Sequence, residues 1–189
     1  MTDAAVAGRA RRWPVITALG VVMIFTWGST YYLMTVLAAP ISNDTGWSLG
    51  SITGALSVGL LVAGLVSPIV GRAIARHGGR LVLATGCALI ASGLLVIASA
   101  THLMMFWSGW LLLGLGMATG LYDPAFASLG RLYGRDARSA ITALTLWGGF
   151  ASTVCWPLST LMLDAWGWRG VAAAYAVLHL CGTLPLVLW

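Results

Sequence analysis

The chain has 189 residues, of which 59% are hydrophobic and only 8% are charged. Its charged residues are ten arginines and five aspartates, with no lysine or glutamate. Water-soluble domains carry about 25% charged residues, so this composition excludes a soluble domain and indicates a protein that folds in the lipid bilayer. The net charge of +5 does not indicate nucleic-acid binding, because the arginines lie in short gaps between apolar segments rather than on a polar face.

Six apolar segments follow one another along the chain, each near or above the ~20 residues that a helix needs to cross a membrane. They are 14–38, 49–74, 81–100, 103–129, 139–163 and 171–189. The first segment is longer than the apolar part of a signal peptide, about 7 to 15 residues, so we expect it to be retained as a helix. The sequence therefore predicts an all-α, polytopic membrane protein with six transmembrane helices after a cytoplasmic N-terminal tail, residues 1–13.

The positions of the arginines predict the orientation in the membrane. Nine of them lie on one side of the predicted bundle, and only Arg169 lies on the other. The positive-inside rule then places the N-terminus in the cytoplasm. Aromatic belts at the two interfaces would contain Trp13 and Trp189 on the inner side, and Trp47, Trp107, Trp110, Trp166 and Trp168 on the outer side. Arginine used without lysine fits a GC-rich bacterial genome, and on that interpretation the location is the bacterial plasma (inner) membrane.

An internal repeat appears when the sequence is shifted by 89 residues. The shift aligns Gly20 with Gly109, Gly59 with Gly148, Pro68 with Pro157, Gly78 with Gly167, Arg80 with Arg169, and Gly93 with Gly182. The Pro, Gly and Arg matches are the informative ones, because they mark the same helix–turn–helix corner twice. We expect two three-helix repeats, 14–100 and 103–189, the second inverted because three is an odd number. The inversion accounts for Arg169 on the outer side.

Residues 71–80 read Gly-Arg-Ala-Ile-Ala-Arg-His-Gly-Gly-Arg. This stretch resembles the signature between helices 2 and 3 of the major facilitator superfamily, with matches at Gly71, Arg76, Gly78 and Arg80. Ala75 stands where an aspartate is usual and Gly79 where a basic residue is usual, so the resemblance leaves the usual charge latch at this corner in question.

The resemblance implies a carrier of twelve helices in two six-helix halves, with the substrate between them. Gly46-Trp47-Ser48 is similar to the branch that contains monocarboxylate and oxalate/formate carriers. Because the family needs about twice this length, we expect the chain to be an N-terminal half that ends inside helix 6. Its partners would be the lipid bilayer, a small-molecule substrate, and a missing C-terminal half or a second copy.

Asp123 is the only carboxylate inside a predicted span, where an unpaired acid costs about 3 kcal/mol or more. Its depth favours a salt bridge with Arg76 or Arg80 that closes an inner gate. Coupling to a proton or to the substrate is the alternative, and a tolerated residue at the membrane edge is a third. Pro124 is expected to kink the helix and free backbone carbonyls beside the acid.

Residues 26–32 form a polar and aromatic interruption in the first span. Trp27 and Tyr31 are four residues apart and share a helix face, with Thr30 beside them. In the family, helices 1, 2, 4 and 5 line the central cavity, so the resemblance makes five residues candidates for the substrate cavity: Trp27, Thr30, Tyr31, Tyr122 and Trp147. The alternative is that the hydroxyl groups bond to their own helix and the aromatic rings only pack.

Small residues recur at every fourth position of the second span, namely Ala55, Gly59, Ala63, Ser67 and Gly71, and Gly116 and Gly120 repeat the spacing in the fourth. Such stripes let helices approach closely. Packing within the bundle is one interpretation. A surface that slides against the other half of the carrier is the second.

Secondary active transport of a small solute by alternating access (uniport, symport or antiport) is the predicted function. We expect no cofactor or metal, because Cys87, Cys155 and Cys181 lack metal-ligand spacing, and no ATP-binding loop is present. A non-transporting membrane interaction protein is one alternative. A rhomboid-like intramembrane hydrolase is another, suggested by Ser48 in a Gly-x-Ser-x-Gly string and by His179. We expect no enzyme, because that string lies in an outer loop rather than on a strand-to-helix turn.

Overall fold

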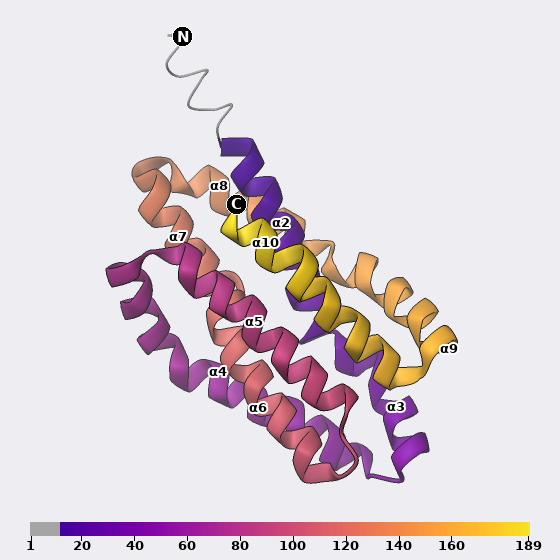
Figure 1. Cartoon of the computed structure of the whole chain (residues 1–189). Coiled ribbons are helices and arrows are strands. Elements are labelled where there is room, and N and C mark those ends of the chain that lie inside the picture. The colour runs from indigo at the N-terminus through magenta and orange to yellow at the C-terminus, as the bar shows by residue number, and fades with distance from the viewer. Residues whose placement is uncertain (1–11) are drawn as a thin grey trace.

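The computed structural model describes residues 12–189, and every regular element in this part of the chain is a helix (Figure 1). The α-helices are α2 (Arg12–Ser29), α3 (Leu33–Thr45), α4 (Leu49–His77), α5 (Gly79–Ala98), α6 (Leu103–Gly120), α7 (Tyr122–Tyr133), α8 (Ala137–Gly149), α9 (Ala151–Leu178) and α10 (Leu184–Leu188). A 3-10 turn, Gly134–Asp136, joins α7 to α8, and a π-helix, His179–Thr183, joins α9 to α10. The all-α prediction is confirmed, whereas Arg9 and Arg11 of the predicted tail lie outside the described residues.

Four helical stretches are long and apolar enough to cross a membrane: Trp13–Thr45, Leu49–His77, Gly79–Ala98 and Leu103–Leu188. The last has 86 residues, and the chain reverses direction within it, at the 3-10 turn and again at Gly167 (Figure 1). The chain is therefore a multi-pass membrane protein, as predicted. The count of six spans and the boundaries of the two repeats stay predictions.

Non-helical residues interrupt three predicted spans, and the fifth span is broken at Phe150, between α8 and α9. The first is broken at residues 30–32, between α2 and α3, and the fourth at Leu121, where φ is −89° and ψ is −160°. Pro124 lies in the first turn of α7 and has no N–H to donate to the carbonyl four residues before it. The expected interruption beside Asp123 is thus present.

Backbone breaks recur 89 residues apart. Tyr32 and Leu121, which precede α3 and α7, are separated by this interval. So are Gly78 (φ 86°, ψ 164°) and Gly167 (φ 66°, ψ 177°), two glycines with similar backbone angles. Non-glycine residues rarely adopt this conformation. These backbone features recur at the same 89-residue interval as the sequence matches.

Glycines bring α6 close to its two neighbours. A Cβ atom on Gly86 of α5 would lie 2.9 Å from the Cα of Gly120, and one on Gly116 would lie 2.9 Å from the nitrogen of Ile90. On the other side of α6, a Cβ on Gly114 would lie 3.0 Å from the Cα of Gly59. In lipid the hydrophobic effect does not hold helices together, so close backbone contact stabilises their association through van der Waals packing. Gly59, Gly116 and Gly120 therefore pack within the bundle, as does the fully buried Ala55.

The two ends of the bundle differ in charge. The α4–α5 corner, the 3-10 turn and the end of α10 share one end, and the α3–α4 loop and the Gly167 corner lie at the other (Figure 1). The described arginines in or beside the segments of the first end are Arg72, Arg76, Arg80, Arg131, Arg135 and Arg138, whereas Arg169 belongs to the second.

Two residues of the predicted outer aromatic belt are not at a lipid interface. Trp110 is 1% exposed and Trp168 is 4% exposed. Trp110 packs beside Phe106, with ring centroids 6.4 Å apart, and the Nε1 of Trp168 donates to Asp44 at 2.9 Å. The belt prediction was wrong for both, because each ring packs inward against other helices.

Candidate functional site

A cavity of about 430 Å³ lies where α7 begins, and α2, α4, α6 and α7 line it. Trp27 comes from α2 and Ser67 from α4, while Tyr122 and Asp123 open α7 immediately after the break at Leu121. Ala63, a further member of the small-residue stripe, also lines it. The structure therefore brings together three predicted site residues, Trp27, Tyr122 and Asp123, from helices far apart in the sequence.

An aromatic cluster extends from this cavity: Trp27 and Tyr122 line it, whereas the predicted residue Tyr31 packs behind them and does not. The ring centroids of Trp27 and Tyr122 are 5.2 Å apart, and Tyr31 meets Trp27 edge-on at 5.7 Å. Phe126 stacks on Tyr122 at 5.0 Å, and Tyr32 lies 5.4 Å from Tyr31. Sequence reasoning missed Phe126 and Tyr32, although Phe126 is four residues after Tyr122 on the same helix and shares its face.

Two polar groups give this cavity its chemistry. Asp123 is exposed and makes no ion pair with another described residue. The indole Nε1 of Trp27 is buried and has no hydrogen-bond partner. A buried donor without a partner costs about 1–3 kcal/mol, so the indole N–H favours a ligand that brings an acceptor oxygen. The cavity thus combines an unpaired hydrogen-bond donor with a carboxylate, beside the hydroxyl-bearing residues Ser67 and Tyr122.

Two other predicted residues lie elsewhere. Thr30 is fully buried, and its hydroxyl donates to the carbonyl of Thr26 at 2.6 Å, which is the self-bonding alternative. Trp147 packs against Gly20 of α2, where an added Cβ would collide with the indole ring. Neither side chain lines the 430 Å³ cavity. Tyr122 extends toward α8 and donates to the carbonyl of Thr145 at 3.3 Å.

Comparison with known proteins identifies the family, because the sequence profile of the Major Facilitator Superfamily matches residues 19–189. The chain belongs to this superfamily. It is 32% identical over 154 residues to monocarboxylate transporter 11 of Homo sapiens, a match that covers 78% of this chain and 31% of the relative. It is 34% identical over 134 residues to monocarboxylate transporter 13 of Bos taurus, covering 68% of this chain and 31% of the relative.

The matched region spans about a third of the length of these relatives. Membership of the superfamily supports transport across a membrane and points to a transporter rather than an enzyme. The resemblance predicted from residues 71–80 is thereby confirmed, and the relatives agree with the monocarboxylate branch.

The superfamily signature forms the corner between α4 and α5. Gly78 ends α4, and its N–H donates to the carbonyl of Ile74 at 2.9 Å. Gly79, which replaces the usual basic residue, is buried against Ser128 of α7, and a Cβ at position 79 would collide with that hydroxyl. Close contact between α5 and α7 therefore explains why the side chain is missing here.

Arg131 of α7 makes the polar contact at this corner that sequence reasoning missed. Its Nη1 donates to the carbonyls of Ile74 and Ala75, at 2.7 and 2.6 Å. These carbonyls lie in the last turn of α4, at the negative end of the helix dipole, which attracts cations. The sequence signal for this contact was the position of Arg131, which follows the fourth predicted span as Arg76 follows the second.

The predicted gate pair between Asp123 and Arg76 or Arg80 is not formed in the described structure. Asp123 is the second residue of α7 and lines the cavity together with Ser67. Arg131 lies eight residues later, about 12 Å further along the helix, and it is this residue that reaches the corner. Counting residues along the predicted helix did not give the distance between Asp123 and the arginines.

The serine and histidine of the hydrolase alternative are not partners. Ser48 caps α4, and its hydroxyl accepts from the N–H of Ser51 at 3.1 Å. His179 instead bonds through Nε2 to Ser29 at 2.7 Å and through Nδ1 to Thr183 at 2.8 Å. Ser29 and His179 are fully buried. This pair fastens the end of α2 to the π-helix.

The opposite corner, at Gly167, is held by a charged cluster. Asp44 of α3 accepts from Arg169 at 2.7 Å and from Trp168 at 2.9 Å. Arg169 also donates to the carbonyl of Ala100 at 3.1 Å, and its guanidinium lies 4.0 Å from the centre of the Trp168 ring. The cluster ties together the ends of α3 and α5 and the bend of α9.

Proposed function

We propose that the chain forms one bundle of a secondary active transporter that moves a small organic solute by alternating access. The observation that carries this proposal is the 430 Å³ cavity at the helix break, which joins Trp27, Tyr122 and Asp123. Carriers of this kind bind substrates at interrupted helices, where freed backbone groups supply polar contacts. Monocarboxylates are the substrate class that the names of the relatives indicate.

The polar groups of the cavity have separate roles in this proposal. The Trp27 indole donates a hydrogen bond to a carboxylate oxygen of the substrate. Asp123 takes up a proton, which removes a negative charge that would repel the substrate and couples substrate entry to proton movement. An intramembrane carboxylate without a counter-ion is suited to such coupling.

The second bundle of the carrier is supplied by a further segment or by a second copy. The part of α4 beyond Gly59 leaves large apolar side chains uncovered, with Leu61 60%, Leu65 69% and Ile69 57% exposed. We place the arginine-rich end in the cytoplasm, following the positive-inside rule, and the protein in a bacterial plasma (inner) membrane. The inverted relation of repeats 14–100 and 103–189 provides the symmetry that alternating access uses.

The coupling role of Asp123 can be tested in proteoliposomes that contain the protein expressed from its complete gene. We expect Asp123→Asn to exchange radiolabelled lactate across the membrane but to lose its accumulation under an imposed proton gradient. Asp164 is an exposed acid near the Gly167 corner and outside the cavity, so Asp164→Asn should accumulate lactate like the unmodified protein. Normal accumulation by Asp123→Asn would reject coupling through this residue.

A further inference from the structure

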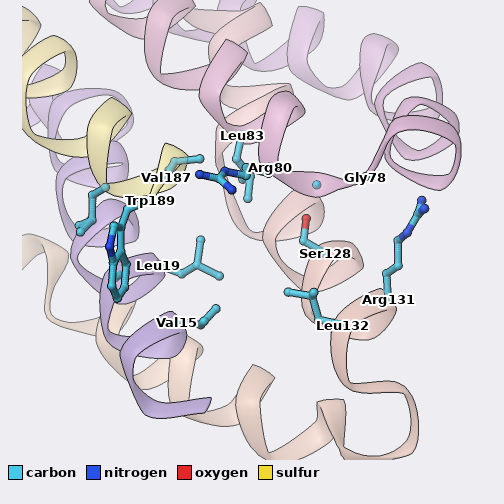
Figure 2. Close-up of a pocket in the computed structure, with 13 residues that line it drawn as sticks. Val15, Leu19, Gly78, Arg80, Leu83, Ser128, Arg131, Leu132, Val187 and Trp189 are labelled. Atoms are coloured by element: carbon cyan, nitrogen blue, oxygen red, sulfur yellow. The ribbon is translucent and has the colours of Figure 1, made fainter. Parts of the chain in front are cut away.

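A second cavity, of about 570 Å³, lies at the arginine-rich end of the bundle (Figure 2). The start of α2, the start of α5, the end of α7 and the end of α10 line it. Its walls are largely apolar and include Leu19, Leu83, Leu132 and Val187. It shares no lining residue with the 430 Å³ cavity, so an inference about it does not rest on the proposed function.

Arg80 supplies a positive charge to this cavity. It is exposed and has no ion-pair partner among the described residues. None of the described residues that line the cavity is acidic. Figure 2 shows Arg80 between α10 and α7, beside Val187, whereas the guanidinium of Arg131 points away and is bound to the carbonyls of α4. An uncompensated cation therefore borders an apolar cavity.

The repeat counterpart of Arg80 shows what such an arginine binds when an acid is supplied. Arg169 is 89 residues further along the chain and pairs with the carboxylate of Asp44. The residue 89 positions after Asp44 is Tyr133, so the repeat does not place a carboxylate at the corresponding position near Arg80. An anion that pairs with Arg80 would therefore come from outside the described lining.

We propose that the 570 Å³ cavity binds an anionic phospholipid from the adjacent leaflet. The lipid phosphate pairs with Arg80, and one acyl chain occupies the apolar space between α2, α5, α7 and α10. Basic pockets between membrane helices recognise anionic headgroups, and the apolar walls match the acyl chain. A soluble anion would leave those walls unused, and a zwitterionic lipid would bring a second charge that Arg80 does not favour.

The test uses native mass spectrometry of the detergent-purified protein, titrated with dioleoylphosphatidylglycerol or dioleoylphosphatidylcholine. We expect the protein to retain more phosphatidylglycerol than phosphatidylcholine. Arg80→Gln should reduce phosphatidylglycerol retention about fivefold, the effect of one arginine near an anionic lipid. Arg72→Gln, an exposed arginine of the same end that does not line the cavity, should retain it unchanged.

A second variant tests the acyl-chain site without altering Arg80. Ala18 lines the cavity, and Ala18→Phe should lower phosphatidylglycerol retention by filling the space. Equal retention of the two lipids by the unmodified protein would overturn the proposal, as would equal losses in Arg80→Gln and Arg72→Gln. Full retention by Ala18→Phe, or displacement of the lipid by glycerol phosphate, would show headgroup binding without the cavity and would also overturn it.

Discussion

The corners at Gly78 and Gly167 share a backbone conformation but use their arginines differently. At the Gly167 corner, Arg169 pairs with Asp44 and donates to the carbonyl of Ala100, which fastens three helix ends together. At the Gly78 corner, Arg80 borders a cavity without a described acid, and Arg131 from another helix donates to two carbonyls in the last turn of α4. Glycine therefore sets the path of the chain at each corner, whereas the residues of neighbouring helices decide the side-chain contacts.

The largest expected effect tests the shared backbone. Gly78→Ala and Gly167→Ala should each lower the free energy of unfolding by roughly 1–3 kcal/mol, because both positions have positive φ with extended ψ, a region nearly restricted to glycine. Unfolding in mixed detergent micelles measures the change. Gly130→Ala is the matched control, since it is helical with open space around it, and it should gain up to about 1 kcal/mol. If only one of the two alanine variants lost stability, the two corners would not share the same requirement for glycine.

A smaller effect tests the contact specific to the Gly78 corner. Arg131→Gln should lower the free energy of unfolding by about 1 kcal/mol, less than a buried charged hydrogen bond contributes, because Arg131 is exposed. The same unfolding assay applies. Arg135→Gln, an exposed arginine in the nearby 3-10 turn, should leave stability unchanged. Equal stability of the two variants would show that Arg131 does not hold this corner.

The smallest effect concerns the charged cluster of the Gly167 corner. Asp44→Asn should lower the midpoint of thermal unfolding slightly in low salt, because the Arg169–Asp44 pair is half-exposed and screened by ions. The difference from the unmodified protein should shrink in 1 M salt. Asp164→Asn, another exposed acid near this corner, serves as the control. A loss that does not depend on salt would show that charge pairing is not what Asp44 contributes.

Much of the fold follows from apolar length and charge. The predicted spans begin within a few residues of helices such as α4, α5 and α6, because about 20 apolar residues are needed to cross a bilayer. Pro124 marked the α6–α7 break through its missing N–H. The family signature was also readable, because Gly78 has a backbone requirement that other residues meet poorly.

Contacts between residues far apart in the chain could not be predicted from the sequence. Ser29 and His179 lie 150 positions apart, and no periodicity links them. Trp110 occurs where an interfacial tryptophan is expected, and the sequence does not distinguish a ring that faces lipid from one that packs on α4. The absence of a base at Gly79 was visible, but its cause is the contact with Ser128. Of the predicted cavity residues, Thr30 does not line the 430 Å³ cavity, and its hydroxyl donates to a carbonyl of its own helix.

The central claim is that substrate passes through the cavity between α2, α4, α6 and α7. Ser67 lines this cavity, whereas Leu65, on the same helix, is 69% exposed and lies outside it. The most direct test is lactate uptake by proteoliposomes containing the protein from its complete gene, with Ser67→Trp compared with Leu65→Trp at equal insertion. Loss of uptake in Ser67→Trp with normal uptake in Leu65→Trp is the predicted result. Normal uptake by Ser67→Trp would contradict the claim.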